Sequence, residues 1–256
     1  MPNPKLSIVI PVFNEGVNLK ILVPFLGALV ETPHEVLIAH DIENDDSIPA
    51  VKSMQKKYSN IKLVHNTFGK GVINAIKAGV KNSAGEYVLT IAADDIGPLL
   101  AIEDMVALMD QGMDLVNATR YAHGGRNIGG IFISRMLSTI INKLFHVFCG
   151  SSLTDPTFGV KMFKRQKFNE LKLEAKPIGW AVAFEFAIKA QAAGWKLGEV
   201  PLISLNRMYG EGKSSFRLNW AKEYSKWFFW GMKNLLFSGK KSRVIVRVPE
   251  KIRLHK

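Results

Sequence analysis

The feature that most constrains this chain is the alternation, over its first hundred residues, of short apolar runs with amphipathic stretches. The short runs 6–10, 35–39, 61–65 and 86–92 have the length and composition of buried strands. Strands that alternate with helices of about a dozen residues form βαβ units and a mostly parallel sheet. The sequence therefore predicts an α/β fold, a mostly parallel Rossmann-like sheet with flanking helices.

The intervening stretches predict the helices, and the pattern changes after Asp110. Apolar periodicity favours these helices: 17–29 (interrupted near Pro24), 48–58, 71–81 and 182–193. Further strands are expected at 114–118 and 197–203. Two long apolar stretches, 128–148 and 218–237, are interrupted by basic or polar residues and are too mixed to cross a bilayer.

Composition excludes several classes of protein. With 256 residues, 47% of them hydrophobic and 22% charged, the chain can bury a sizeable core and is not disordered. Cys149 is the single cysteine, which excludes an internal disulfide and a Cys-rich zinc site. The first residues lack the apolar core of a signal peptide, and the early apolar run 21–30 is too short for a membrane span. We therefore expect a cytoplasmic protein.

The net charge is +12, and much of it is concentrated near the end of the chain. Residues 240–256 carry seven basic side chains against Glu250 alone. Such a segment can meet nucleic acid, anionic lipid or solvent. Charge alone does not choose among these three.

Polar clusters follow the predicted strands, at 11–15, 41–46, 69–71 and 94–95. Ligands of open α/β sheets bind beyond the carboxyl ends of the strands, so these clusters are the first candidates for a site. Each is weak alone, because a polar turn more often caps a helix or faces solvent. Together, acidic groups and Lys70 at adjacent strand ends can bind a divalent cation and the diphosphate that it neutralises.

At this point the sequence resembles the family-2 glycosyltransferases, which have the GT-A fold. Residues 8–15 (IVIPVFNE) are similar to the opening strand and turn of that family, and 85–88 (GEYV) lead to Asp94 as in the approach to its DxD motif. The segments that follow resemble the dolichyl-phosphate mannose synthase and polyprenyl-phosphate glycosyltransferase branch: 119–121 (TRY), 155–159 (DPTFG), 198–201 (GEVP) and 207–213 (RMYGEGK).

The resemblance implies roles for individual residues. Positions that hold the nucleotide's base and ribose match Pro11, Asn14, Glu15 and Asp41. Asp94 matches the second DxD carboxylate, which binds Mg²⁺ or Mn²⁺ bridging the diphosphate, and Asp95 is its neighbour. Arginines that grip an acceptor phosphate match Arg120 and Arg135, and Asp155 lies in an acceptor-site motif. A basic segment that closes over the donor phosphates matches Arg207 and Lys213.

Two positions depart from the family pattern. Ala92 stands where the first DxD carboxylate is expected, and His40 precedes Asp41 where two Asp are common. Asp95 is the second candidate metal ligand beside Asp94, although on an extended chain its side chain points the opposite way from that of Asp94. Magnesium usually keeps several waters, so one lost oxygen need not abolish binding.

The type of acceptor decides whether a base is needed. A sugar hydroxyl needs a general base, whereas a lipid phosphate already carries its negative charge. Glu185 is the one carboxylate considered as such a base, although a surface helix position accounts for it equally well. The candidate catalytic residues are therefore Asp94, Arg120, Arg207 and Glu185, and the favoured reaction is inverting hexosyl transfer (mannose or glucose type) from a nucleotide diphosphate sugar to a polyprenyl or dolichyl phosphate.

The apolar stretches favour a peripheral location on the inner face of a membrane. Stretches 128–148 and 218–237 mix apolar runs with Lys and Arg as interfacial helices do, and Trp220, Trp227 and Trp230 suit the headgroup zone. Packing into the core or against a second copy is the alternative. We expect a glycosyltransferase domain over 1–217, with a nucleotide-sugar half (1–110) and an acceptor half (111–217), followed by a helix and basic tail over 218–256.

Three other functions stay open on the sequence. One is transfer to a saccharide hydroxyl in polysaccharide or cell-envelope assembly, and another is a degenerate nucleotide-sugar-binding protein, motivated by Ala92. A nucleic-acid binder would explain the basic charge, but no motif favours it, and no nucleic-acid partner is expected.

Overall fold

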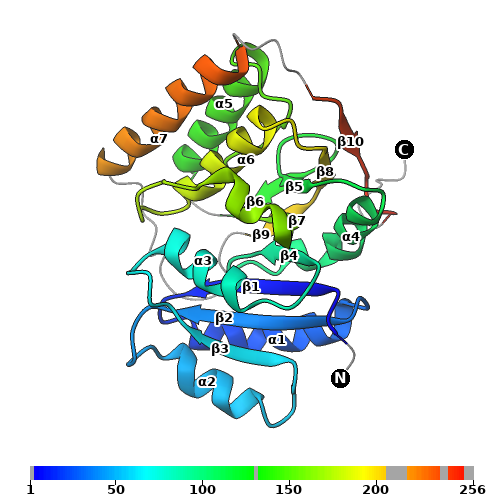
Figure 1. Ribbon diagram of the computed structural model, residues 1–256, viewed down its shortest axis with the longest axis vertical. Helices are drawn as coiled ribbons and strands as arrows, with labels where there is room; N and C mark the ends of the chain where they lie inside the picture. The colour runs from blue at the N-terminus through cyan, green and yellow to red at the C-terminus, as the bar shows by residue number, and fades with distance from the viewer. Residues whose placement is uncertain (1–2, 130–131, 206–217, 237–241, 251–256) are drawn as a thin grey trace.

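The computed structural model describes residues 3–129, 132–205, 218–236 and 242–250, and it is built around one eight-stranded sheet (Figure 1). The strand order is β10-β8-β5-β7-β4-β1-β2-β3. The strands are β1 (Leu6–Val12), β2 (His34–His40), β3 (Ile61–His65), β4 (Tyr87–Thr90), β5 (Leu115–Thr119), β7 (Lys161–Lys164), β8 (Leu197–Pro201) and β10 (Val244–Val246). All neighbours pair in parallel except β7, which is antiparallel to both β4 and β5. The predicted α/β fold with a mostly parallel sheet is confirmed.

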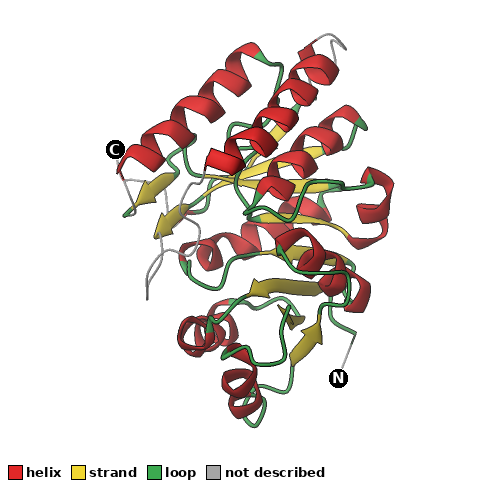
Figure 2. Cartoon of the chain, turned by 90° about the vertical axis from the view of Figure 1, so that its left-hand side faces the viewer, coloured by secondary structure: helices red, strands yellow, loops and turns green. Residues whose placement is uncertain are grey.

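Helices cover both faces of this sheet (Figure 2). The helices are α1 (Gly16–Leu29), α2 (Ser47–Met54), α3 (Val72–Asn82), α4 (Ile102–Asp110), α5 (Phe132–Phe148), α6 (Ala181–Ala192) and α7 (Leu218–Gly231). Leu6, Ile8 and Ile10 of β1 pack into a core with α1, α2 and α4. Val9 points the other way, into a second core with α3, α5, α6 and α7. The strands are apolar on both faces because both faces are covered.

Several shorter elements complete the fold. A two-stranded parallel sheet joins β6 (Arg126–Ile128) to β9 (Ile203–Leu205). One 3₁₀ segment, Gly97–Ala101, precedes α4, and another, Arg165–Leu171, follows β7. The chain after α7 continues as a π-helical turn, Met232–Leu236, before β10.

Helix α1 is continuous, so the interruption expected near Pro24 is wrong. Proline removes one backbone donor and crowds the preceding turn, which usually breaks a helix. Here Pro24 and Lys20, four residues earlier, both lie on the exposed side of α1. The carbonyl that loses its partner is therefore on the side of the helix that water reaches.

The segment after residue 217 contributes to the core. Trp227 of α7 is 1% exposed, and its indole nitrogen donates to Glu223 Oε1 at 2.9 Å. The expectation that Trp227 lies in a headgroup zone is therefore wrong. Strand β10 extends the central sheet by pairing in parallel with β8.

Replacing Trp227 with Ala should lower the free energy of unfolding by about 3–5 kcal/mol, because it leaves a large cavity under α7. Its matched control is Phe229→Ala, since Phe229 lies on the same helix but is 61% exposed. The control should change the free energy by less than about 0.5 kcal/mol. Urea unfolding measures both values, and equal effects would contradict the packing of α7 on the core.

Candidate active site

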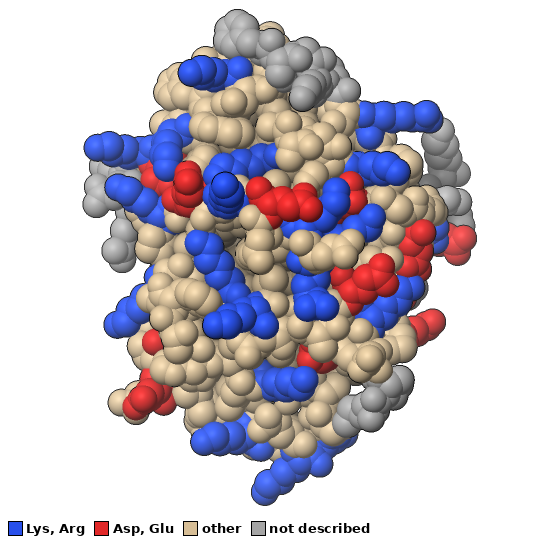
Figure 3. All heavy atoms as spheres, viewed as in Figure 1, with Lys and Arg blue, Asp and Glu red and all other residues tan. Residues whose placement is uncertain are grey.

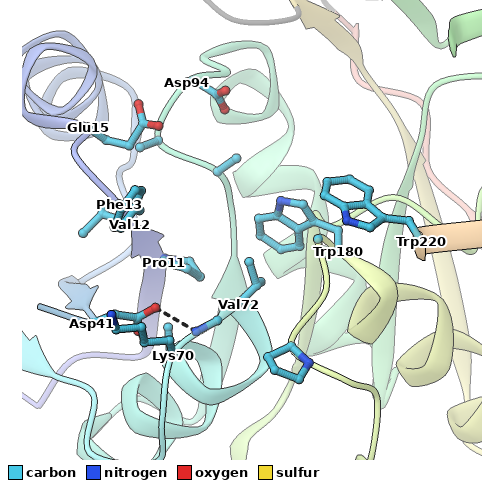
Figure 4. A pocket seen from close by; sticks show the side chains of 16 residues that line it. Pro11, Val12, Phe13, Glu15, Asp41, Lys70, Val72, Asp94, Trp180 and Trp220 are labelled. Carbon is cyan, nitrogen blue, oxygen red and sulfur yellow. Dashed lines mark hydrogen bonds between the residues drawn. The ribbon is translucent and has the colours of Figure 1, made fainter. Parts of the chain in front are cut away.

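A cavity of about 360 Å³ lies beyond the carboxyl ends of β1 and β4 (Figure 4). Its polar side chains are Glu15, Asp41, Lys70 and Asp94. The other lining residues are Pro11, Val12, Phe13, Gly71, Val72, Ala75, Ala92, Ala93, Pro177, Gly179, Trp180 and Trp220. Five of the sequence-predicted site residues therefore share one cavity: Pro11, Glu15, Asp41, Lys70 and Asp94.

Parallel pairing brings these residues together. β1 lies between β2 and β4 and runs parallel to both. The segments that follow the three strands therefore leave the sheet at the same edge, with Phe13, Asp41 and Asp94 on them.

The turn after β1 is held by the acidic segment after β2. Asn14 has a φ of +53°, a left-handed conformation that Asn tolerates better than most residues. Its backbone N–H donates to the Asp45 carboxylate at 3.1 Å, and its side-chain oxygen accepts from the backbone N–H of Asp46 at 3.2 Å. The Asp46 carboxylate in turn accepts from the backbone of Gly16 at 2.8 Å. Asn14 thus shapes the cavity rim and is not among the lining residues.

Asp41 fastens β2 to the start of α3. Its Oδ1 accepts from Asn66 Nδ2 and its Oδ2 accepts from the Gly71 backbone, both at 2.7 Å. Gly71 has a φ of +113°, and a Cβ there would lie 2.4 Å from Pro177. Glycine is therefore required at position 71, where the turn that carries Lys70 packs against Pro177.

Asp94 and Asp95 have different surroundings. Asp94 lines the cavity. Asp95 is buried, and its carboxylate accepts from the backbones of Gly97 and Leu205 at 3.0 Å and from Ser204 Oγ at 2.5 Å. Asp95 thus ties β9 to the segment before α4 and is not among the lining residues.

The cavity residues suit a metal ion that is held jointly by the protein and by a bound substrate. Within the described residues no three His, Cys, Asp or Glu side chains gather as a metal site, and Ala92 supplies no ligand. Magnesium is commonly held by one or two carboxylates together with substrate phosphate oxygens and water. Asp94 in the cavity wall matches that arrangement and does not match a cage made by the protein alone.

Arg120 and Asp155 form a buried ion pair at the end of β5. Arg120 Nε donates to Asp155 Oδ2 at 2.8 Å and Nη2 donates to Oδ1 at 3.0 Å. The guanidinium carbon lies 4.2 Å from the ring centre of Phe158 and 4.9 Å from that of Tyr121. These contacts fix the side chain of Arg120, which is 13% exposed, and use two of its five N–H donors.

Arg135 of α5 is connected with the segment after β5 by hydrogen bonds. Its Nη1 donates to the backbone carbonyl of Asn127 at 3.4 Å. Asn127 Nδ2 donates to the Tyr121 hydroxyl at 3.3 Å, and that hydroxyl donates to Ser138 of α5 at 3.0 Å. The two arginines are therefore linked through Tyr121 and Asn127.

A buried polar network, which the sequence did not predict, supports this region. Lys161 Nζ donates to Asn117 Oδ1 and to the Pro156 carbonyl, and burial lowers the pKa of Lys161 to about 7. Glu199 accepts from the Thr154 backbone and hydroxyl at 2.9 Å, and burial raises the pKa of Glu199 to about 7. The network joins β5, β7 and β8 to the segment 154–158, which carries Asp155.

Glu185 lies apart from the cavity. It is fully buried in α6, its oxygens accept from the backbones of Glu174 and Ala175 at 2.7 Å, and it pairs with Lys189 at 2.7 Å. These contacts make it an anchor for the segment before α6. Two other candidates, Arg207 and Lys213, lie outside the described residues.

Trp180 and Trp220 are lining residues that the sequence did not single out for a site. Each indole lies against a glycine: a Cβ on Gly159 would lie 2.5 Å from Trp180, and one on Gly179 would lie 3.0 Å from Trp220. The Gly-Trp pair at the start of α6 was the available signal. The sequence alone does not indicate which face of the sheet α6 packs against, so this Gly-Trp pair could not be assigned to the cavity.

The chain is similar in sequence to known proteins. Residues 7–172 match the model of glycosyl transferase family 2. A dolichol-phosphate mannosyltransferase of Pyrococcus furiosus is 26% identical over 212 residues, 82% of this chain and 59% of the relative. An undecaprenyl-phosphate 4-deoxy-4-formamido-L-arabinose transferase of Enterobacter sp. is 28% identical over 218 residues, 83% of this chain and 63% of the relative. The chain thus spans about three fifths of the length of these two relatives.

Solved structures show the same fold. Glucosyl-3-phosphoglycerate synthase from Mycobacterium tuberculosis, in complex with Mn²⁺, UDP-glucose and phosphoglyceric acid, superposes with a TM-score of 0.63 at 15% identity, covering 98% of this chain and 91% of that one. S. aureus TarS (1–349) gives a TM-score of 0.54 at 18% identity, covering 80% of this chain and 59% of that one. The GT-A fold implied by the sequence resemblance is confirmed. Because the family model covers well over half of its residues, this chain belongs to glycosyl transferase family 2.

Proposed function

We propose that this protein transfers a hexose of the mannose or glucose type, with inversion, from a nucleotide diphosphate sugar to a polyprenyl or dolichyl phosphate at a membrane surface. The observation that carries the proposal is a cavity with a carboxylate-lined wall in a chain that also holds an arginine, Arg120, fixed in place by Asp155 at the end of β5. The polyprenyl-phosphate acceptors named for the Pyrococcus and Enterobacter relatives support the same acceptor class.

The donor nucleotide is assigned to the wall made by β1, β2 and the start of α3. Asp41 holds two hydrogen bonds and retains lone pairs that can accept from a base or ribose. Lys70 offers a positive charge to the diphosphate, and Pro11 and Glu15 complete this wall. Arg207 and Lys213 are proposed to add charge from outside the described part of the chain.

Asp94 is proposed to hold Mg²⁺ or Mn²⁺ together with the donor diphosphate. When bound, the ion would neutralise charge that develops on the leaving nucleotide diphosphate. Asp95 is a less suitable ligand, because its carboxylate accepts hydrogen bonds from β9 and from the segment before α4.

Arg120 is proposed to orient the acceptor phosphate. Two of its donors hold Asp155, and the remaining three can bind phosphate oxygens in a fixed direction. A phosphate oxygen then attacks the anomeric carbon, while the bond from that carbon to the donor diphosphate breaks and its electron pair leaves with the nucleotide. No proton has to be removed from the acceptor, which agrees with the position of Glu185 in the core.

Helix α5 carries the proposed membrane-binding face. Large apolar side chains are exposed along it, with Phe132 and Phe148 more than 65% exposed. The exposed apolar residues are Phe132, Met136, Leu137, Ile140, Ile141, Leu144, Val147 and Phe148. The described atoms at the upper end of the face in Figure 3 are tan or blue, and α5 itself carries Arg135 and Lys143 but no acidic residue. Such a surface suits anionic lipid.

The described helices lack the length and apolarity needed to cross a bilayer. The α5 face would therefore hold the protein at the membrane from one side. Attachment to the inner, cytoplasmic face remains part of this proposal.

Nucleotide and metal should bind together. In thermal unfolding with UDP- and GDP-sugars at about 100 times Kd, the matching donor should raise Tm by roughly 5–10 °C in the presence of Mn²⁺. Mn²⁺ alone should shift Tm little, because Asp94 alone is a weak site. Asp94→Asn should remove the increment due to Mn²⁺, whereas Glu43→Gln, an exposed carboxylate on the neighbouring loop, should keep it. A full Mn²⁺ shift in Asp94→Asn would contradict the assignment.

Transfer to farnesyl phosphate should depend on the guanidinium of Arg120. Arg120→Lys keeps the positive charge but loses the planar set of guanidinium N–H donors. This loss should lower kcat/KM by about 10- to 100-fold. Arg126→Lys, an exposed arginine of β6, is the matched control and should be nearly unchanged. The assay follows label from the donor into a lipid product, with unfolding midpoints measured for each variant. Transfer to saccharide hydroxyls with no lipid product would contradict the proposed acceptor.

Vesicle binding should depend on α5. Ile140→Gln combined with Leu144→Gln should weaken binding to vesicles rich in phosphatidylglycerol by at least about tenfold, since each substitution removes apolar contact area. Phe25→Gln, an exposed apolar residue of α1, is the control and should bind as the unmodified chain does. Sedimentation with vesicles measures this. If the unmodified chain is a dimer that the double variant dissociates, and neither binds vesicles, the face is a subunit contact instead.

A further inference from the structure

Two tryptophans form a flat apolar wall in the cavity. Trp180 starts α6 and Trp220 lies in the first turn of α7, and Figure 4 shows their indoles side by side, across the cavity from Pro11, Asp41 and Lys70. Both side chains are only partly buried, although Trp is among the residues that gain most from burial. The glycines beneath them leave room for each ring to lie flat. Trp180 and Trp220 thus form an aromatic surface that a ligand in the cavity can contact.

The surroundings of this surface are apolar. Val72 lies near Trp180 in Figure 4, Gly179 lies against Trp220, and Pro177 is another apolar lining residue. The polar side chains Glu15, Asp41, Lys70 and Asp94 occupy the strand-end side. A sugar ring needs hydrogen-bond partners for its hydroxyl groups, and the described tryptophan side offers few beyond the indole N–H groups.

The aromatic surface is contiguous with Arg120. Gly159, against which Trp180 lies, directly follows Phe158, whose ring stacks under the Arg120 guanidinium at 4.2 Å. Tyr224, one turn along α7 from Trp220, is partly buried, hydrogen-bonds with the backbone of Trp180 and interacts electrostatically with Arg120. A fixed cation therefore adjoins an apolar platform, an arrangement complementary to an amphiphilic phosphate.

We propose that Trp180 and Trp220 bind the first isoprene units of the acceptor, next to the phosphate held by Arg120, so that the pair selects phosphates that carry an unsaturated branched chain. This inference rests on the proposed function and assigns the chain-binding part of its acceptor site. Flat π-faces suit the methyl groups and double bonds of isoprene units, which bury apolar area without needing polar partners.

Aromatic residues of helix α7 mark a path for the isoprene units that follow the first ones. Trp220, Tyr224 and Phe228 recur every four residues and lie on one side of the helix. The Phe228 ring centre is 5.1 Å from that of Phe145 on α5, the helix whose opposite face is exposed and apolar. Aromatic side chains therefore lead from the cavity towards the proposed membrane-binding face.

The test measures ligand binding to the full chain by titration calorimetry, in the presence of Mg²⁺ and the nucleotide diphosphate that binds. Trp220→Ala should raise the Kd for farnesyl phosphate about tenfold or more, and Trp220→Phe should restore most of the affinity. Inorganic phosphate, which lacks a chain, should bind both variants as it binds the unmodified protein. Trp180→Leu is a second variant, and Phe25→Ala, an exposed aromatic of α1, is the control.

Each outcome has a distinct meaning. Weaker binding of the nucleotide diphosphate in Trp220→Ala would make the platform a base subsite and overturn the inference. Weaker binding of the complete nucleotide sugar, with that of the nucleotide diphosphate unchanged, would make it a hexose subsite. If the unmodified protein transfers sugar to farnesyl phosphate but Trp220→Ala and Trp180→Leu match Phe25→Ala, the inference fails while the proposed function stands. If the unmodified protein neither binds nor glycosylates farnesyl phosphate, both fail.

Discussion

The parallel register of β1 between β2 and β4 is the constraint on which the whole site depends. It makes the segments after three strands, far apart in the sequence, leave the sheet at one edge. Asp41 and Asp94 meet in one cavity for this reason. The price of parallel pairing is burial of both faces, which explains why these strands contain few polar residues and why helices cover both sides.

The second half of the sheet depends on buried charge rather than on apolar packing alone. Asp155 and Lys161 are almost completely buried, and each has specific partners. Removing one member of such a group leaves the other charged group unpaired, which is strongly destabilising. Ionic groups in this position fix the direction of Arg120 more closely than apolar packing could, because a bidentate pair allows few orientations.

Much of the nucleotide side could be predicted from the sequence, because its signals are local. Strand-sized apolar runs and the polar residues after them predicted the cavity residues Pro11, Glu15, Asp41, Lys70 and Asp94. Strand β7 was not predicted, because Lys161–Lys164 begins and ends with lysine, and the burial of Lys161 depends on Asn117 of another strand. Glu185 has the sequence context of an ordinary helix position. Its burial follows from the backbone N–H groups of Glu174 and Ala175, which only the folded chain brings near.

The aromatic residues illustrate the same limit. Trp220 and Trp227 are seven residues apart on one helix, yet one lines the cavity and the other is in the core. The hydrophobicity of both side chains predicts that each will be covered, but it does not predict whether the protein core or a ligand will cover it. Helix α5 differs again, because large apolar side chains along it, such as Phe132 and Phe148, are left exposed by the described chain.

A crystal structure of the ternary complex with farnesyl phosphate and the nucleotide diphosphate that binds would test the central claim most directly. The account predicts the diphosphate beside Asp94 and Lys70, the lipid phosphate on Arg120, and the first isoprene units on Trp180 and Trp220. A lipid phosphate bound away from Arg120, or a nucleotide outside the cavity beyond β1 and β4, would contradict it.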